Sequence, residues 1–307
     1  MIKFALMIPT LNAEKELVKL LPSIRMQTRQ PDQIIVIDSS SDDRTAELLC
    51  AAGAEVHVIP RADFNHGGTR MMGTRRAVEL GAEIVIFMTQ DAILHSENSL
   101  EQILSVFEDI SVGSAYGRQL PHSNARPIET YSRLFSYGEI STKHSKADIP
   151  EVGFRTAFCS NAFSAFRTSA LLKAGGFPPH TIFGEDTLAV AELILSGYSH
   201  CYVAEAEVRH SHSYTLLQEF RRYFDVGVMH THHKILIENF GAPSGAGFAF
   251  VIGELRYLLR TNLWLIPEAC LRTGLKFAAY KMGRKESIFS LAWKRRLSMH
   301  KRFWVNT

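Results

Sequence analysis

Two acidic sites in this 307-residue sequence combine residue types and positions that group-transfer chemistry requires. Asp91 closes a largely apolar run that begins at Ile84, and such a run predicts a buried strand that delivers the carboxylate to its carboxyl end. Open α/β sheets keep their ligands at that edge. Glu185 and Asp186 open an amphipathic helical pattern further along the chain. One acid could then hold a metal ion while another takes a proton.

Each acid also has an ordinary structural explanation. A carboxylate at the end of an apolar run must be paired, solvated or bound to a cation. A hard cation such as Mg²⁺ at Asp91 would also bridge a diphosphate and neutralise the charge on a leaving group. Alternatively, Asp91 is a turn or cap residue, and Glu185 and Asp186 complement the dipole of the helix that they begin.

Two further segments carry residues suited to binding a nucleotide. Asp38 ends the apolar run Ile34–Ile37, where it could accept hydrogen bonds from a base or a ribose, or cap a turn with the serines that follow. Gly67 and Gly68 permit close approach of the backbone to a ligand, and Arg70 is suited to bidentate recognition of phosphate at a helix start.

These glycines do not form a dinucleotide fingerprint, because the first predicted strand is followed by Pro9 and Thr10 and not by glycines. The sequence therefore argues against a Rossmann dehydrogenase. His66, taken alone, is more often a structural hydrogen-bonding residue than a functional one.

A pair of histidines offers a second way to hold a metal. His210 and His212 follow the predicted strand Ala206–Arg209 and share one face by alternation. They could ligate a metal, or they could simply end a surface strand. A later histidine group lacks a cysteine or an acid at ligand spacing, and we interpret it as a polar helix end: His230, His232 and His233.

The first 120 residues alternate short apolar runs with helix-spaced patterns, which is typical of an α/β fold with a mostly parallel sheet covered by helices. We predict strands at residues 4–8, 33–38, 55–60, 83–89, 114–117, 161–166 and 206–209. We predict helices at residues 14–27, 42–52, 69–80, 97–107, 168–174, 187–196 and 214–229.

Residues 121–150 are polar and contain three prolines, so we expect a long loop of the kind that covers a substrate in α/β enzymes. The four cysteines are widely spread without paired spacing, which favours a reducing compartment and buried thiols. The N-terminus is too short for a signal-peptide core, and we interpret it as the first strand.

Charge is divided unevenly along the chain. Residues 255–307 contain 12 Lys and Arg against two acids, a net charge of +10, whereas the first 254 residues carry 22 basic and 29 acidic groups, a net charge of −7. This division indicates an acidic catalytic body and a basic tail that meets a polyanionic surface. We expect that surface to be an anionic membrane, and we expect no nucleic acid partner.

The basic region is not expected to cross the membrane. Its longest uncharged stretch, residues 239–253, falls short of the roughly 20 apolar residues that a spanning helix needs and is broken by a proline and glycines. Four apolar residues of the final segment share one helical side, which predicts a helix lying in the membrane interface or, alternatively, one packed on the catalytic body: Phe289, Trp293, Leu297 and Trp304.

Taken together, the ordered segments resemble glycosyltransferase family 2, whose members have the GT-A nucleotide-sugar-binding fold. The resemblance covers about residues 1–240 and is carried by Ile8–Asn12, Val36–Asp42, Asn65–Arg70, Thr89–Ala92 and Gly184–Asp186. Within the family the sequence is similar to bacterial rhamnosyltransferases in Phe64–Arg70, Thr89–Ala92 and the terminal run Leu297–Lys301. This implies a GT-A catalytic domain at residues 1–240 and a helical, membrane-associating region at residues 241–307.

The resemblance also implies roles for single residues. It places the nucleotide sugar at Pro9, Thr10, Asp38, Arg70, Gln90 and Asp91. Mg²⁺ or Mn²⁺ would bind Asp91 and His210, with His212 in reserve. Thr89 stands where the family's Asp-X-Asp motif has its first acid, so the site has one carboxylate fewer. Asp186 would be the catalytic base, and Glu185 would orient the acceptor.

The implied activity is an inverting transfer of L-rhamnose from dTDP-β-L-rhamnose to a hydroxyl of a lipid-linked or polysaccharide acceptor. Such an enzyme would build bacterial O-antigen, capsule or wall polysaccharide as a peripheral protein on the inner face of the cytoplasmic membrane. A UDP-hexose donor is an alternative, and so is a catalytically silent membrane-associated protein that binds nucleotide sugars. A sugar nucleotidyltransferase would need a glycine-rich loop with an arginine directly after the first strand, and that loop is missing.

Overall fold

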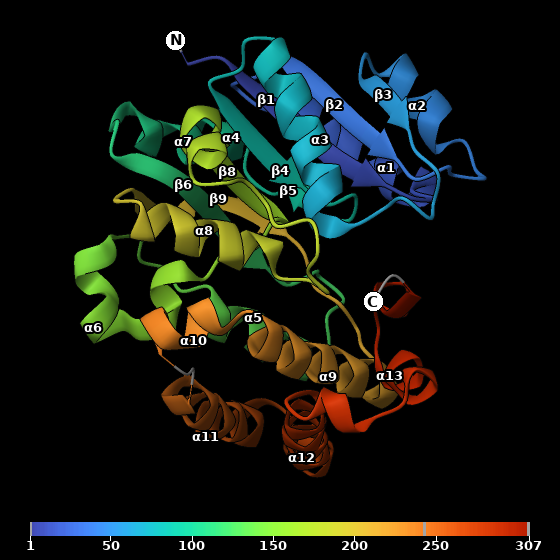
Figure 1. Ribbon diagram of the computed structural model, residues 1–307, viewed down its shortest axis with the longest axis vertical. Helices are drawn as coiled ribbons and strands as arrows, with labels where there is room; N and C mark the ends of the chain where they lie inside the picture. Colours follow the sequence, from blue (N-terminus) through green and yellow to red (C-terminus); the bar gives the residue numbers. More distant parts are fainter. Residues whose placement is uncertain (1, 242–243, 306–307) are drawn as a thin grey trace.

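The computed structural model describes residues 2–241 and 244–305, and Figure 1 shows a helix-covered sheet with a group of C-terminal helices on one side. The described residues form one nine-stranded sheet in the order β3-β2-β1-β4-β8-β6-β9-β5, with β7 paired to β9. The strands are β1 Phe4–Thr10, β2 Gln33–Asp38, β3 Glu55–Val58, β4 Ile84–Met88, β5 Ile93–Leu94, β6 Val112–Leu120, β7 Thr142–His144, β8 Phe163–Arg167 and β9 Ser199–Arg209. Strands β1 to β4 are parallel, and β8 runs antiparallel to both of its neighbours, β4 and β6.

The helices fall into two groups along the chain. Those of the sheet-bearing part are α1 Glu14–Arg25, α2 Thr45–Ala51, α3 His66–Glu79, α4 Ser99–Ser105, α5 Pro127–Ser136, α6 Ile149–Val152, α7 Thr168–Lys173, α8 Glu185–Leu195, α9 Leu216–His232 and α10 Lys234–Phe240. The C-terminal group contains α11 Ser244–Thr261, α12 Ile266–Gly283 and α13 Leu291–Leu297. Short 3₁₀ turns include η3 Gly153–Ala157, η4 Leu263–Leu265 and η6 Phe303–Val305.

Alternate side chains of the central strands enter two cores on opposite faces of the sheet. Leu6 and Ile8 of β1 pack with residues of α1, α2 and α4, whereas Ala5 and Met7 pack with residues of α3, α7, α8 and α9. All five residues of β4 are buried, as expected for a strand covered by helices on both faces. Because β1, β2 and β4 are parallel, their carboxyl ends lie at the same edge of the sheet, where the predicted site residues begin.

The prediction of a long loop at residues 121–150 is wrong. This segment contains α5, β7 and the start of α6. Pro127 occupies the first turn of α5, where a missing N–H costs nothing, and the Glu129 carboxylate accepts a hydrogen bond from the Arg126 N–H at 3.1 Å. Tyr131 then packs against Phe250 of α11, so the apolar face of α5 is covered by a helix more than a hundred residues away.

The C-terminal helices pack on the sheet-bearing part through α9. Gly227 of α9 and Gly283 of α12 let these helices meet closely, because a Cβ on Gly283 would lie 2.0 Å from the carbonyl oxygen of Phe224. The two regions predicted on either side of residue 240 are thus in direct contact through α9 and α12. Within the described ranges, no helix has the length and apolar character to cross a bilayer.

The predicted apolar stripe of the final segment is not a free helical face. Helix α13 ends at Leu297, and Trp304 belongs to the separate turn η6, where it is 2% exposed. Phe289 and Leu297 pack against the core, and Trp293 alone of the four is well exposed, at 55%. The alternative of packing on the catalytic body is therefore correct for this segment.

The four cysteines are free thiols, but only half of them are buried. Cys159 and Cys201 lie in the core, as expected, whereas Cys50 and Cys270 are exposed. The prediction of buried thiols is wrong for these two residues, because each occupies the solvent-facing side of a helix whose other side packs.

Candidate active site

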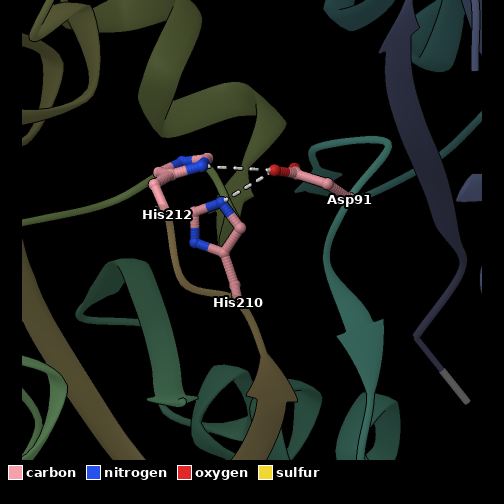
Figure 2. Close-up of side chains that lie close together, drawn as sticks. All are labelled: Asp91, His210 and His212. Carbon is pink, nitrogen blue, oxygen red and sulfur yellow. Dashed lines mark ion pairs between the residues drawn. The ribbon is translucent and has the colours of Figure 1, made fainter. Parts of the chain in front are cut away.

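The structure brings Asp91, His210 and His212 together at the edge of the sheet, as Figure 2 shows. Asp91 follows β4, and both histidines follow β9. One ligand atom from each of the three residues lies within 4.8 Å of the others. The Asp91 Oδ2 atom is 3.5 Å from His210 Nε2 and 3.7 Å from His212 Nδ1. The predicted metal ligands and the reserve candidate thus form one cluster.

Gln119, at the end of β6, sets the tautomer of His210. Its side-chain oxygen accepts a hydrogen bond from an Arg133 guanidinium N–H at 2.7 Å, which fixes the orientation of the amide because a guanidinium only donates. The same oxygen lies 2.9 Å from His210 Nδ1, so Nδ1 must carry the proton and donate. The free lone pair of neutral His210 is therefore on Nε2, which faces Asp91.

This arrangement fits a bound cation. A carboxylate oxygen and an unprotonated imidazole nitrogen that face each other are both acceptors, and a proton or a metal ion must lie between them. Although burial opposes ionisation of Asp91, His210 lowers the pKa of this carboxyl below its ordinary value. Burial and the neighbouring His210 lower the pKa of His212 to about 4, which leaves its ring neutral and able to ligate.

The second acidic site lies at the start of α8. Gly184 precedes the helix in the left-handed conformation, with φ of +78°, which directs Glu185 inward. Glu185 is 3% exposed, and its carboxylate lies 2.9 Å from an Arg70 guanidinium nitrogen. The Asn161 side chain donates a second hydrogen bond to Glu185 at 3.1 Å. Although burial opposes ionisation of Glu185, the charge of Arg70 lowers its pKa.

Asp186 has the opposite electrostatic environment. Burial and the adjacent charge of Glu185 raise the pKa of Asp186 to about 6. The backbone N–H of Asn161 donates a hydrogen bond to Asp186 Oδ2 at 3.0 Å and fixes the carboxylate. Two neighbouring acids with pKa values pushed apart are the arrangement expected where one acid accepts protons and the other stays charged.

A short chain of hydrogen bonds joins the two acidic sites. Gln119, which holds His210, also donates from its side-chain nitrogen to Ser160 Oγ at 2.8 Å. Ser160 is followed directly by Asn161, whose N–H holds Asp186. The cation cluster and the candidate base are therefore positioned by one network at the junction of β6 and β8.

Among the residues predicted to contact the nucleotide, Thr10 and Asp38 form a buried pair where β1 and β2 end. The Thr10 hydroxyl donates to Asp38 Oδ1 at 2.8 Å, and the Ser41 N–H donates to Asp38 Oδ2 at 2.8 Å. Gln90 accepts a hydrogen bond from the Leu11 N–H at 2.9 Å, so it ties the loop after β4 to the loop after β1. These contacts shape the edge at which Pro9 and Asp91 also lie.

Arg70 occupies a different place from the one that its predicted phosphate contact suggests. It is 4% exposed and is enclosed between Glu185 and the carbonyl oxygen of His66, at 2.9 and 3.2 Å. A contact with the diphosphate stays a prediction, and the observed geometry makes Arg70 the partner of Glu185.

Gln119, Asn161 and Ser160 were not predicted from the sequence. Each belongs to a segment without a catalytic motif, and their roles depend on pairings between strands far apart in the chain. One signal was available in the sequence: Gln119 is a polar residue in a strand that is otherwise rich in small and apolar residues. In the structure its side chain is buried, with 1% of the residue exposed.

Comparison with known proteins identifies the family to which this fold belongs. Residues 5–175 match the model of the glycosyl transferase family 2. The chain is 43% identical to the O-antigen chain rhamnosyltransferase WbaN of Salmonella anatum and 42% identical to RfbN of Salmonella typhimurium, in each case over 99% of this chain and 96% of the relative.

A solved structure is similar as well. This structure is a mannosyltransferase from Pyrobaculum calidifontis in complex with GDP-Man and Mn²⁺. The two chains superpose with a TM-score of 0.59 at 18% sequence identity, and the match covers 99% of this chain and 86% of the mannosyltransferase chain. The chain therefore belongs to glycosyltransferase family 2, and the predicted family and fold class are confirmed.

Proposed function

We propose that the chain is an inverting rhamnosyltransferase that moves L-rhamnose from dTDP-β-L-rhamnose to a hydroxyl of a lipid-linked O-antigen chain. The observation that carries this proposal is the similarity to two O-antigen chain rhamnosyltransferases over 99% of this chain. The similarity extends beyond the catalytic fold to the C-terminal helices. This matters because a shared catalytic fold alone does not determine the function.

Asp186 is the proposed base. Its carboxylate would take the proton of the acceptor hydroxyl while the oxygen bonds to the anomeric carbon and the bond from that carbon to the diphosphate oxygen breaks. Its pKa of about 6 keeps it ionised near neutral pH yet close to the range in which proton transfer is effective. Glu185, held by Arg70 and Asn161, stays charged and maintains this pKa.

Asp91, His210 and His212 are the proposed holders of a divalent cation. When bound, the cation would neutralise charge on the departing diphosphate. Two imidazoles and one carboxylate suit Mn²⁺ better than Mg²⁺, which prefers oxygen ligands. The solved mannosyltransferase with Mn²⁺ supports the same choice. Thr10, Asp38 and Gln90 would shape the nucleoside side of the site.

We further propose that the C-terminal helices rest on the anionic inner face of the cytoplasmic membrane, where a lipid-linked acceptor would be found. The supporting surface is not the final segment but the end of α11 and the turn η4, where exposed apolar and basic side chains alternate. Its members are Arg256, Leu259, Arg260, Leu263 and Trp264, and we call it the α11 surface. Trp264 is 85% exposed, which is unusual for so large an apolar side chain.

A transfer assay tests the proposed donor. The acceptor is the lipid-linked saccharide that accumulates in a strain from which this gene has been deleted, and the donors are dTDP-L-rhamnose, UDP-glucose and GDP-mannose. We expect product from dTDP-L-rhamnose only, with an α-linked rhamnose by NMR. Product from UDP-glucose alone would reject the donor and leave the fold and the base in place.

A further inference from the structure

A large cavity among the described residues has none of the cation ligands in its lining and has no role in the chemistry above. It has a volume of about 660 Å³ and is lined by three segments distant in sequence, residues 62–66, 179–182 and 299–303. This volume is within the range of ~300–1,000 Å³ that small-molecule sites occupy. The C-terminal tail thus forms one wall of a cavity whose other walls belong to the catalytic fold.

The tail is held in place by a buried carboxylate. Asp225 of α9 is fully buried, and its Oδ2 atom accepts hydrogen bonds from the N–H groups of Met299 and His300 at 2.9 and 3.2 Å. Arg302 donates to the carbonyl oxygen of Arg61 on the opposite side of the cavity, and Trp304 is buried beyond it. Figure 1 shows the C-terminal end of the chain running from α13 back toward the sheet.

The cavity lies beside the candidate base. The carbonyl oxygen of His66, which is on the cavity wall, accepts a hydrogen bond from Arg70 at 3.2 Å. The same guanidinium pairs with Glu185, the residue next to Asp186. Arg70 and Glu185 therefore link the cavity wall at His66 to the neighbourhood of Asp186.

The lining combines aromatic rings with hydrogen-bonding groups. The ring of His66 meets those of Phe64 and His300 edge to face, at 5.2 and 5.1 Å between centroids. Polar groups come from Asn65, Thr181 and Lys301. His300 Nε2 is buried without a hydrogen-bond partner among the described residues, a feature that calls for an explanation.

The aromatic rings of the lining carry no charge. Burial lowers the pKa of His66, and burial together with His66 lowers the pKa of His300 to about 3, so both rings are uncharged at neutral pH. Of the charged lining residues, Asp63 and Lys301 have opposite signs, and the Arg302 guanidinium is oriented by the carbonyl oxygen of Arg61, to which it donates. Neutral aromatic faces with scattered donors and acceptors suit the ring faces and hydroxyls of sugars better than a diphosphate.

We propose that this cavity binds the sugar units of the acceptor glycan that precede the hydroxyl to be modified, and we call it the acceptor pocket. The inference rests on the proposed function, since it assigns the glycan of that same reaction to a site. The C-terminal tail would then determine which acceptor is used, and Asp225 would act as a positioning residue for that tail.

Acceptor kinetics test this assignment. Phe64→Ala and Lys301→Ala should each raise the KM for the accumulated lipid-linked saccharide at least tenfold, with unchanged dTDP binding and unchanged slow hydrolysis of the donor by water. Asp225→Ala should raise the same KM by loosening the tail. Lys285→Ala, an exposed lysine of the C-terminal region outside the pocket, is the matched control and should leave the KM unchanged.

A competition experiment distinguishes the sugar from its lipid carrier. The oligosaccharide released from the accumulated intermediate by mild acid should inhibit transfer in the wild type and lose this effect in Phe64→Ala. Competition by farnesyl diphosphate alone, or an unchanged acceptor KM in folded pocket variants, would overturn the assignment. If the wild type transferred no rhamnose but used another donor, the proposed function would fail while the pocket was still tested with that donor.

Discussion

An Arg70 guanidinium nitrogen lies 2.9 Å from a carboxylate oxygen of Glu185, and the side chains of both residues are 5% exposed. One partner of this buried ion pair, Glu185, is the residue directly before Asp186. The pair keeps Glu185 ionised, and the ionised Glu185 in turn raises the pKa of Asp186. Arg70 thus acts on the candidate base in two opposite ways, because it keeps Glu185 ionised while its own charge lowers the pKa of Asp186.

The ion pair predicts a large stability cost when one partner is removed. Arg70→Met leaves the Glu185 charge buried and unpaired, and breaking such a pair typically costs about 3–5 kcal/mol. The double variant Arg70→Met with Glu185→Leu should recover much of this loss, because an apolar pair of similar volume replaces the charges. The free energy of unfolding in urea measures both. A single variant as stable as the wild type would contradict the buried-pair interpretation.

The pH dependence of transfer should reflect the ionisation of Asp186. A base works when deprotonated, so a pKa raised to about 6 predicts that kcat/KM falls as the pH drops through about 6. Glu185→Gln removes the neighbouring negative charge, which should lower the pKa of Asp186 and move the acid limb to lower pH. Rates are measured at saturating Mn²⁺ to keep the histidine cluster occupied. An acid limb at the same pH in Glu185→Gln and the wild type would show that the charge of Glu185 does not raise the pKa of the base.

Gln119 should affect metal affinity although it is not a ligand. Gln119→Leu removes the acceptor that fixes the His210 tautomer, and loss of such supporting contacts typically costs about 10- to 100-fold in metal affinity. Asp91→Ala should lose more, whereas Thr89→Ala should change little. Titration of Mn²⁺ into the protein with dTDP measures these effects, with Gln102→Leu on α4 as the control. Unchanged Mn²⁺ binding in Asp91→Ala would remove the metal from this cluster.

Membrane binding should depend on the α11 surface. The triple variant Leu259→Ser, Leu263→Ser and Trp264→Ser should sediment less with anionic liposomes than the wild type, because each side chain is exposed and apolar. Ile140→Ser, at 79% exposure on the catalytic part, serves as the control. Binding of the wild type should weaken as salt rises, since the basic residues are screened. Equal sedimentation of the triple variant and the control would locate the membrane contact elsewhere.

The local patterns that predicted the site were those of strand ends. Asp38 and Asp91 each follow an apolar run, and His210 follows an alternating strand; the sheet then brings these strand ends to one edge. Strand β9 begins at Ser199 and not at residue 206, because its first half pairs with β6, and the sequence alone does not reveal that pairing. A local sequence pattern does not show which distant strand a segment pairs with.

The features that the sequence did not reveal have the same physical origin. Helix α5 was not predicted, because its apolar residues pack against α11. The local sequence around α5 does not show that a distant helix covers this face. Arg70 has the residue type of a phosphate ligand, but the closeness of α3 and α8 gives it a buried carboxylate partner. For the final segment the sequence left two alternatives open, a membrane face or the catalytic body, and the contact of Asp225 with Met299 shows that the tail after α13 lies on the body.

The central claim, that Asp186 is the catalytic base, is tested most directly by Asp186→Asn. The asparagine keeps the size of the side chain and removes the proton acceptor, so kcat should fall by about 10²- to 10⁴-fold while dTDP binding stays unchanged. Glu192→Gln on the same helix is the matched control and should transfer at the wild-type rate. A folded Asp186→Asn enzyme that turns over within threefold of the wild type would contradict the assignment.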